Sequence, residues 1–386
     1  MKTCTVPQSA RTLSDKRIPT QPRASHFWRT RGLVLILLLA LAVAGCAPQV
    51  AAGSWAGLVA DSDGLIMANL DRVTRMNEAG TARWEFPSPS DRNQRTQFYS
   101  TPVVTEDAVY VGGFDNKVYA LDRDNGLQIW VNEDATGQII AGLALSNGKL
   151  IVGMGNEGVM ALNQLNGEHL WTFETGQGVW ATPLIVDSTV YVASLDKNLY
   201  AINLDSGAEV WHRDLDGAIA GTPAYLDGFL YVGSFAHKLF KLNASTGEIV
   251  QSFEARNWVW GGPTIAGGIL YFGDLSGYLY ALNASDLSPV WQREVSSGAI
   301  RATPLIVEDM LVVGSRDGHV YAVDRNNSTP VWTQTAPAAV LSDAVLMPDG
   351  LVVVSTINAD SMLVAYDPND SGRQMWQYPP PAPTTQ

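Results

Sequence analysis

The sequence predicts an all-β protein, an eight-bladed β-propeller of four-stranded antiparallel blades. A 17-residue stretch recurs eight times without a gap, and its successive starts lie 40 to 44 residues apart. A period of this length with strand-like content is typical of radial or linear arrays of small sheets. We call the first residue of each stretch the opening residue of its unit. The opening residues are Trp55, Tyr99, Ile140, Trp180, Ala220, Trp260, Arg301 and Leu341.

The fourth unit shows the four expected strands most clearly. We expect strands at residues 182–186, 190–194, 199–203 and 209–212, because these segments are rich in apolar, β-branched and aromatic residues and are separated by turn residues. Pro183 stands near a strand start, where proline is tolerated. Four antiparallel strands joined by tight turns make one blade, and blades repeated around an axis leave only short edges. An open solenoid is the alternative, but the terminal units lack the polar capping pattern of solenoids.

The N-terminal 45 residues indicate export. A basic segment precedes the apolar run 33–45, which is shorter than the roughly 20 residues that a membrane-spanning helix needs. These features are typical of a secretory signal peptide. The run ends in Val-Ala-Gly-Cys, which resembles a bacterial lipobox with Cys46 as the lipidated residue. An uncleaved anchor and an ordinary signal peptide are the alternatives. We therefore expect a lipoprotein signal peptide at 1–45, a linker at 46–54, the propeller at 55–378 and a proline-rich tail at 379–386.

The net charge and the cysteine content limit the classes of partner and ligand that the protein is expected to bind. The chain carries a net charge of −13, and the signal peptide holds seven of its basic residues but one of its acidic residues. Such an acidic domain is repelled by nucleic-acid phosphates and by anionic headgroups. Cys4 and Cys46 are the only cysteines, so the exported domain has no disulfide or thiolate ligand. We expect a monomeric propeller, membrane contact through the lipid, and a lipid-anchored location in the cell envelope, at the outer membrane if the organism has one.

A large aromatic residue recurs in the outer strand of each unit. We expect each ring to pack against the adjacent blade, as core rather than as a ligand site. A small residue late in the second strand, such as Gly112 or Gly233, permits the close approach of that neighbour. The outer aromatic residues are Trp84, Trp130, Trp171, Trp211, Phe253, Trp291, Trp332 and Trp376.

The repeat resembles that of the PQQ-like propeller family. The pattern Thr-Pro, Tyr-Val-Gly, Asp, Val-Tyr-Ala, Gly and Trp is clearest in residues 101–130, 182–211 and 303–332, although Ser328 replaces the usual glycine. The resemblance covers 55–378. It implies one of two functions: a dehydrogenase that binds pyrroloquinoline quinone (PQQ) with calcium, or a non-enzymatic lipoprotein of the BamB type, which scaffolds the complex that assembles outer-membrane β-barrels. The length, the lipobox and the number of blades resemble the second type.

Catalytic residues, a metal site and a cofactor are not expected. A calcium site needs several oxygen ligands, whereas the turn acids Asp71, Asp115, Asp196 and Asp317 fall one to a blade and are better explained by hydrogen bonds to turn amides. The histidines His169, His212, His237 and His319 stand at different places in their units, so they are not expected to converge. The adjacent cysteine pair common in the dehydrogenases is absent. A PQQ-dependent enzyme remains the alternative.

The units differ most at their opening residues. If the first strands line the axis, these residues meet at one mouth of the central channel, where they form an aromatic ring with one cation. Trp, Tyr and Arg are enriched in binding hot spots, so we expect the mouth to bind a segment of a partner protein. There are two alternatives: these side chains only fill the wide axis, or the mouth recognises an envelope polymer or sugar. The predicted binding residues are Trp55, Phe98, Tyr99, Trp180, Trp258, Trp260 and Arg301.

Overall fold

The computed structural model describes residues 56–88, 96–156, 158–358 and 362–380. The chain divides into two units, Met1–Ala51 and Ala52–Gln386, and the described residues all belong to the second. The predicted signal peptide, the linker with Cys46, the opening residue Trp55 and most of the proline-rich tail therefore lie outside the described residues. Within the described ranges, no helix has the length and apolarity that a membrane span requires.

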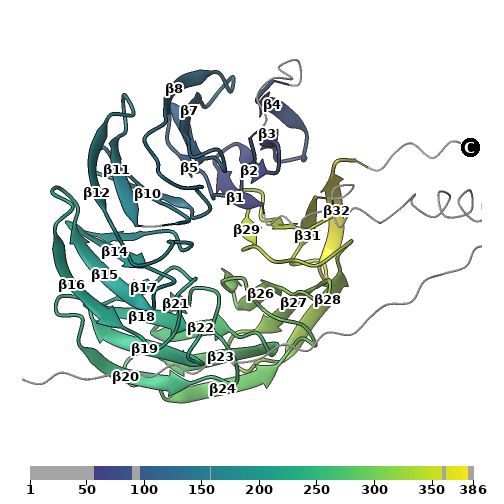
Figure 1. Ribbon diagram of the computed structural model, residues 1–386. Coiled ribbons are helices and arrows are strands. Elements are labelled where there is room, and N and C mark those ends of the chain that lie inside the picture. The colour runs from purple at the N-terminus through teal and green to yellow at the C-terminus, as the bar shows by residue number, and fades with distance from the viewer. Residues whose placement is uncertain (1–55, 89–95, 157, 359–361, 381–386) are drawn as a thin grey trace, which may run out of the picture. The chain divides into compact units, whose positions relative to one another are not determined.

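Eight four-stranded antiparallel sheets, the blades, succeed one another along the chain and surround a central axis (Figure 1). The predicted eight-bladed propeller is confirmed. The first four blades consist of β1 (Gly57–Asp61), β2 (Gly64–Asn69), β3 (Arg72–Asn77) and β4 (Ala82–Phe86); β5 (Val103–Val104), β6 (Ala108–Gly112), β7 (Val118–Asp122) and β8 (Gln128–Asn132); β9 (Leu143–Ser146), β10 (Lys149–Gly153), β11 (Val159–Asn163) and β12 (His169–Phe173); β13 (Leu184–Val186), β14 (Thr189–Ala193), β15 (Asn198–Asn203) and β16 (Glu209–Asp214). The last four consist of β17 (Ala224–Leu226), β18 (Phe229–Ser234), β19 (Lys238–Asn243) and β20 (Ile249–Glu254); β21 (Thr264–Ala266), β22 (Ile269–Gly273), β23 (Tyr278–Asn283) and β24 (Pro289–Glu294); β25 (Leu305–Val307), β26 (Met310–Gly314), β27 (His319–Asp324) and β28 (Pro330–Thr335); β29 (Val345–Leu346), β30 (Val352–Ser355), β31 (Leu363–Asp367) and β32 (Arg373–Tyr378).

Each blade pairs its strands in sequence order, with the first strand innermost and the fourth outermost. The register of the third and fourth strands shifts once in every blade, as between Ala201 and Ile202 of β15 in the fourth blade. Such a bulge bends the outer strand. The extra residue of this bulge, Val210, turns to solvent and is 57% exposed, whereas its neighbour Trp211 is directed into the blade interface.

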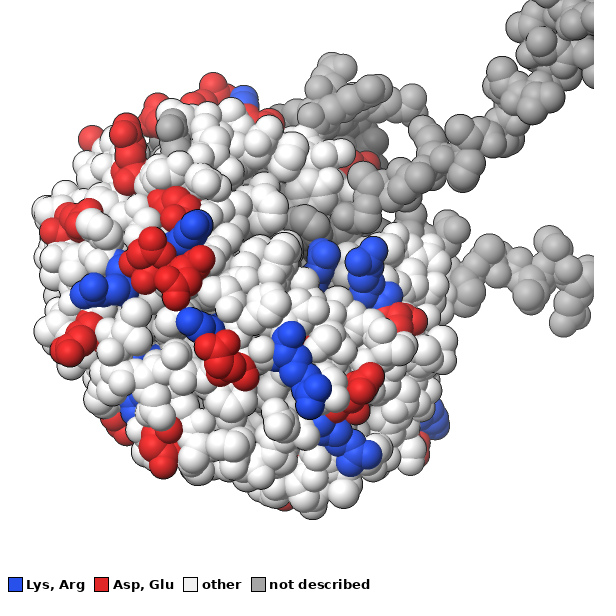
Figure 2. Space-filling view, turned by 60° about the horizontal axis from the view of Figure 1, so that its bottom comes forward, with Lys and Arg blue, Asp and Glu red and all other residues white. Residues whose placement is uncertain are grey.

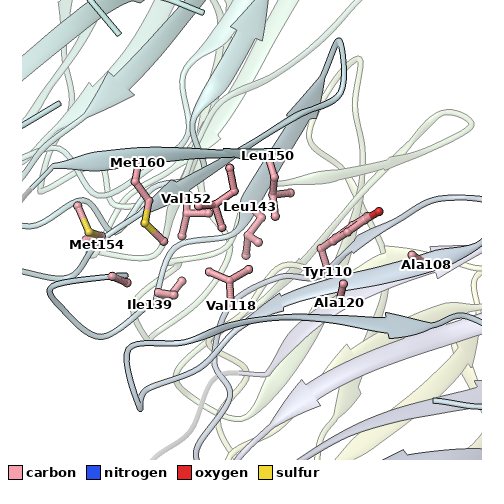
Figure 3. Packing of buried hydrophobic residues seen from close by; sticks show 12 residues of the cluster. Ala108, Tyr110, Val118, Ala120, Ile139, Leu143, Leu150, Val152, Met154 and Met160 are labelled. Carbon is pink, nitrogen blue, oxygen red and sulfur yellow. The ribbon is translucent and has the colours of Figure 1, made fainter. Parts of the chain in front are cut away.

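The hydrophobic core lies between consecutive blades. In the cluster of Figure 3, side chains of β6 and β7 pack against side chains of β10 and β11, with Ile139 between the two sheets. Ile139 immediately precedes an opening residue, and the residues at this position in the described units are all almost fully buried. A side chain at Gly112 would overlap Ile139. The small residue late in the second strand therefore permits this close packing.

The outer tryptophans join each blade to the next. The Trp211 indole N–H donates a hydrogen bond of 3.1 Å to the Ala244 carbonyl of the following blade, and its ring lies against Gly247, whose φ is 67°. Glycine is suited to this position by its conformation and by the absence of a side chain. Equivalent indole-to-carbonyl bonds are made by Trp84, Trp130, Trp171, Trp291 and Trp332.

The fifth blade departs from this pattern, and the placement of Phe253 in the series needs correction. Trp211 lies opposite Ala201, but in the fifth blade Gln251 lies opposite Lys241, and Phe253 follows two residues later. Phe253 still packs on the next blade, with its ring 5.7 Å from that of Tyr280. The Lys241 ammonium takes over the hydrogen bond, because it donates to the Ala284 carbonyl at 2.9 Å. Aromatic periodicity alone could not separate the two positions.

The first and eighth blades meet without exchanging a strand among the described residues. β1 lies beside β29 (Figure 1), and side chains from both blades form one buried cluster. The Trp376 ring lies against Gly80, as the other tryptophans lie against the next blade, but its N–H has no described hydrogen-bond partner. The Tyr378 hydroxyl donates to Glu85 at 3.1 Å. Among the described residues, side-chain packing and a side-chain hydrogen bond therefore join the first and eighth blades.

Candidate partner-binding site at the channel mouth

The described opening residues meet around one cavity of about 380 Å³ on the propeller axis. Each first strand is innermost and runs in the same direction, so the segments that precede these strands converge at one end of the channel. We call these residues together the mouth. It consists of Tyr99, Ile140, Trp180, Ala220, Trp260, Arg301 and Leu341.

Aromatic rings gather on one side of the mouth, over the fourth to sixth blades. The Trp180 and Trp260 rings have centroids 6.3 Å apart, and the Phe235 ring lies 5.0 Å from that of Trp260. Trp258 stacks on Phe235 at 4.7 Å with the planes almost parallel, and it is 42% exposed. We call Trp180, Phe235, Trp258 and Trp260 the aromatic platform. A tryptophan left this exposed beside other rings is a feature of interaction surfaces.

Arg301 of the seventh blade lies next to the platform, and Arg316 of the same blade lies near Arg301. The Arg301 guanidinium lies 4.5 Å from the centre of the Trp260 ring, in cation–π geometry. Burial lowers the pKa of Arg301, and the positive charge of Arg316 lowers it further. Arg316 is exposed on the β26–β27 turn. The two side chains therefore concentrate positive charge at the mouth of an acidic protein.

A second ring of residues lies two positions after the opening residues and lines the same cavity. It consists of Gly57, Thr101, Gly142, Thr182, Thr222, Gly262, Thr303 and Asp343. Asp343 accepts a hydrogen bond of 2.7 Å from the Thr303 amide, and its side chain is open to the channel. Desolvation by the surrounding protein raises the pKa of this carboxyl. The lining is otherwise uncharged at this depth.

Phe98 was predicted at the mouth, and this prediction is wrong. Its side chain is fully buried between the first and second blades, with its ring 5.8 Å from that of Tyr119. Phe98 occupies the position immediately before an opening residue, which Ile139 and Val179 hold in the next units as buried inter-blade side chains. Tyr99 does line the cavity, and its ring contacts Phe114 edge-on. Trp55 lies outside the described residues.

Sequence reasoning missed Phe235 and Arg316. Both stand 15 positions after an opening residue, on the turn between the second and third strands. The backbone amide of each bonds to the connection that leads into its own blade: Phe235 to the Ala218 carbonyl at 2.9 Å and Arg316 to the Ala299 carbonyl at 3.0 Å. This recurring bond brings the turn beside the mouth. Comparing the units at this second position would have found both residues.

The turn acids bond locally, and the histidines lie apart. Asp196 accepts hydrogen bonds from the Asn198 amide and the Tyr200 hydroxyl, and Asp317 accepts them from the His319 amide and the Tyr321 hydroxyl. In the described ranges, no group of three or more His, Asp or Glu side chains could hold a metal ion. Figure 2 shows acidic and basic side chains interspersed on one face, with wide uncharged areas between them.

The family model for the outer membrane protein assembly factor BamB matches residues 44–141, 115–217, 195–303 and 295–386. The chain belongs to the BamB family. A crystal structure of BamB from Moraxella catarrhalis is similar to this propeller with a TM-score of 0.68 and 21% identity, and the match covers 80% of this chain and 92% of that one. A computationally designed propeller, Ika8, has the same TM-score at 15% identity over 81% of this chain and 95% of its own. At these identities the likeness shows the fold. Among curated proteins, none matches the chain.

Proposed function

We propose that this BamB-family propeller is a non-enzymatic scaffold of the cell envelope, lipid-anchored through Cys46, whose mouth binds a segment of a partner protein in an assembly complex. Family membership supports the scaffold role at a coarse level. The observation that carries the proposal is the mouth itself. Large aromatic side chains and an arginine surround an open cavity at positions where the repeat also accepts Ala220. Such residues beside a concave surface are typical of interaction hot spots.

The cavity does not fit PQQ with calcium. Calcium takes six to eight oxygen ligands, several of them carboxylates. Asp343 is the one carboxylate among the described residues that line the cavity, and it already accepts a hydrogen bond from the Thr303 amide. The two arginines nearest the mouth would also repel a cation. The dehydrogenase alternative predicts binding of PQQ in the presence of Ca²⁺, which the absorbance spectrum of the protein after gel filtration would report.

The test replaces the platform and asks whether binding in cells is lost. A photo-crosslinking amino acid at position 258 should give a discrete crosslinked protein band, and the same amino acid at position 165 should not, because Leu165 is 82% exposed in a turn away from the mouth. The double substitution Trp180→Ala and Trp260→Ala should abolish the band at position 258.

The matched control is Leu127→Ala with Leu165→Ala, two exposed apolar positions that do not line the cavity. This control should keep the band. Far-ultraviolet circular dichroism of each purified variant establishes that the propeller is folded. A band that persists at full intensity in the folded Trp180→Ala, Trp260→Ala variant would show that the mouth does not bind the partner.

A further inference from the structure

We propose that Arg301 and Arg316 bind a carboxylate of the partner, so that the mouth recognises an extended peptide segment in which an acidic residue adjoins a large apolar one. This inference rests on the proposed function and names the chemistry of the segment. It follows from three features of the mouth: arginines without acidic partners, a fixed guanidinium, and apolar surface on both sides of it.

Neither arginine forms an ion pair with a described residue, although the protein is rich in acids. Elsewhere in the described ranges, Arg72, Arg75, Arg123, Arg325 and Arg373 each lie within 4 Å of a carboxylate oxygen. The charge that shifts the pKa of Arg301 is instead that of another cation, Arg316. Two like charges held together are mutually destabilising, and a bound anion relieves the repulsion.

The Arg301 guanidinium is held in place. The Trp260 ring lies 4.5 Å from it, and its Nε is buried without a hydrogen-bond acceptor among the described residues. An unsatisfied buried donor is costly unless an acceptor arrives. A carboxylate matches the planar fork of a guanidinium and accepts two parallel N–H bonds. Because the side chain is already oriented, little entropy is lost when the ligand binds.

The acid inside the cavity does not fill this role. Asp343 accepts its hydrogen bond from the Thr303 amide, and no ion pair joins it to Arg301. The positive charge at the mouth therefore remains available to a ligand.

The surroundings favour a peptide over a polyanion. The platform lies on one side of Arg301, and Leu341, the opening residue of the next unit, lies on the other. Apolar and aromatic surfaces bury large hydrophobic side chains, for which a uniformly charged polysaccharide has no counterpart. A segment with one carboxylate between large apolar side chains satisfies both the cations and the platform.

The test is selection from a displayed library of random 12-residue peptides with blocked C-termini, performed on the full propeller domain. Peptides that bind the native protein should be enriched in Asp or Glu next to Trp, Phe, Tyr, Leu or Ile. For an individual selected peptide, replacing the acid with its amide should weaken Kd roughly 10- to 100-fold, the loss expected for a charge-assisted bidentate bond. Affinity for the acidic peptide should also fall as salt is added.

Variants separate this inference from the proposed function. Arg301→Gln with Arg316→Gln should remove the preference for acid over amide and leave weak apolar binding, whereas Arg83→Gln, an exposed arginine of β4, should preserve it. Acid-independent peptides that still require Trp180 and Trp260 would overturn the carboxylate site and leave the scaffold role intact. Failure of the native protein to select any peptide would count against both. Binding of polygalacturonate in preference to peptides would also overturn the inference.

Discussion

At the scale of single residues, a repeated tyrosine–aspartate pair ties the turn between the second and third strands to the blade. In the seventh blade the Tyr321 hydroxyl donates to Asp317 at 2.7 Å, and Ser296 donates to the same carboxylate. Burial alone would raise the pKa of Asp317, but these hydrogen bonds outweigh it, and the pKa lies well below its usual range. The ionised form is therefore the one that the folded blade stabilises.

The linkage between this lowered pKa and folding predicts a pH-dependent effect. Asp317→Asn should reduce the free energy of unfolding at neutral pH. A group with a lowered pKa in the folded state contributes its full stability above its unfolded pKa of about 3.9 and loses it as the pH falls further. The difference between native and variant should thus be constant from about pH 7 to 5 and shrink below about pH 4. Urea unfolding across this range measures it.

The control for this prediction is Asp107→Asn in an exposed turn of the second blade. It should change the free energy of unfolding little at any pH in the same series. A difference between native protein and Asp317→Asn that stays the same down to pH 3 would contradict the role of the ionised carboxylate.

The environment of a residue could be predicted from the sequence where its position recurs in every unit. It was predicted poorly where two consecutive residues lie in different environments. Tyr99 and Phe98 are adjacent, yet Tyr99 lines the cavity and Phe98 is fully buried between two blades. The environment changes because the chain passes from the inter-blade core to the channel between these two residues. Aromatic character could not distinguish them. The position preceding the opening residue is apolar in the other described units, and that regularity is the signal that places Phe98 in the core.

At the scale of elements, one pair of blades replaces the usual contact with a different one. Where most other pairs of blades set a tryptophan against a glycine, the fifth and sixth blades have Gln251 and Leu287. Leu287 is 3% exposed at a φ of 52°, the left-handed conformation in which Gly247 stands in the preceding blade. The loss of a large side chain on one blade is matched by the gain of one on the next. The total volume of the interface is thereby preserved.

This compensation predicts coupled effects on stability. Leu287→Gly should destabilise the protein by roughly 2 to 5 kcal/mol through the cavity it leaves, less the strain relieved at positive φ. Gln251→Trp alone should cost about 1 to 3 kcal/mol through overpacking. The double variant should lose less free energy of unfolding than the losses of the two single variants added together, as measured by urea unfolding in a double-mutant cycle.

Lys241 need not be changed in that experiment. In the first blade Arg75 and Trp84 both donate to the Arg123 carbonyl, so a cation and an indole can share one acceptor. Strict additivity of the two substitutions would show that positions 251 and 287 do not compensate each other.

At the scale of the whole molecule, the described parts of the first and eighth blades join through side chains and share no strand. The described strands of each blade come from one continuous segment, and β1 and β29 meet through side chains as other neighbouring blades do. The joint between the first and last blades is thus of the same kind as most of the other joints, although the indole N–H of Trp376 has no hydrogen-bond partner among the described residues.

This similarity predicts tolerance to circular permutation. A permutant that joins residue 380 to residue 56 through a flexible linker and opens the chain at residue 217, between the fourth and fifth blades, should fold with nearly unchanged secondary structure and a similar urea midpoint. The matched comparison opens the chain at residue 196, inside the fourth blade, and should be less stable because it separates β14 from β15. Equal stability of the two permutants would contradict the view that blades are the structural units.

The number of blades and the class of fold were predictable because a period of about 40 residues admits few arrangements. The strand boundaries were less so. In the fourth blade β13 begins at Leu184 rather than Thr182, because Thr182 and Pro183 belong to the segment that leads in from the channel, and proline cannot donate to a sheet. The aromatic platform is formed by three segments from different blades. It could be predicted only by aligning the turns between the second and third strands as well as the opening residues.

The described strands of each blade come from one continuous segment, which also bears on how such a chain could arise. One blade corresponds to one uninterrupted stretch of about 40 codons, so a tandem duplication in the gene adds a complete sheet and a complete docking surface at once. No existing strand has to change partners for the new blade to be accommodated. The copies are then free to diverge at the positions that face the axis while the interfaces between them are conserved by packing, and a ring of near-identical units can acquire an asymmetric mouth.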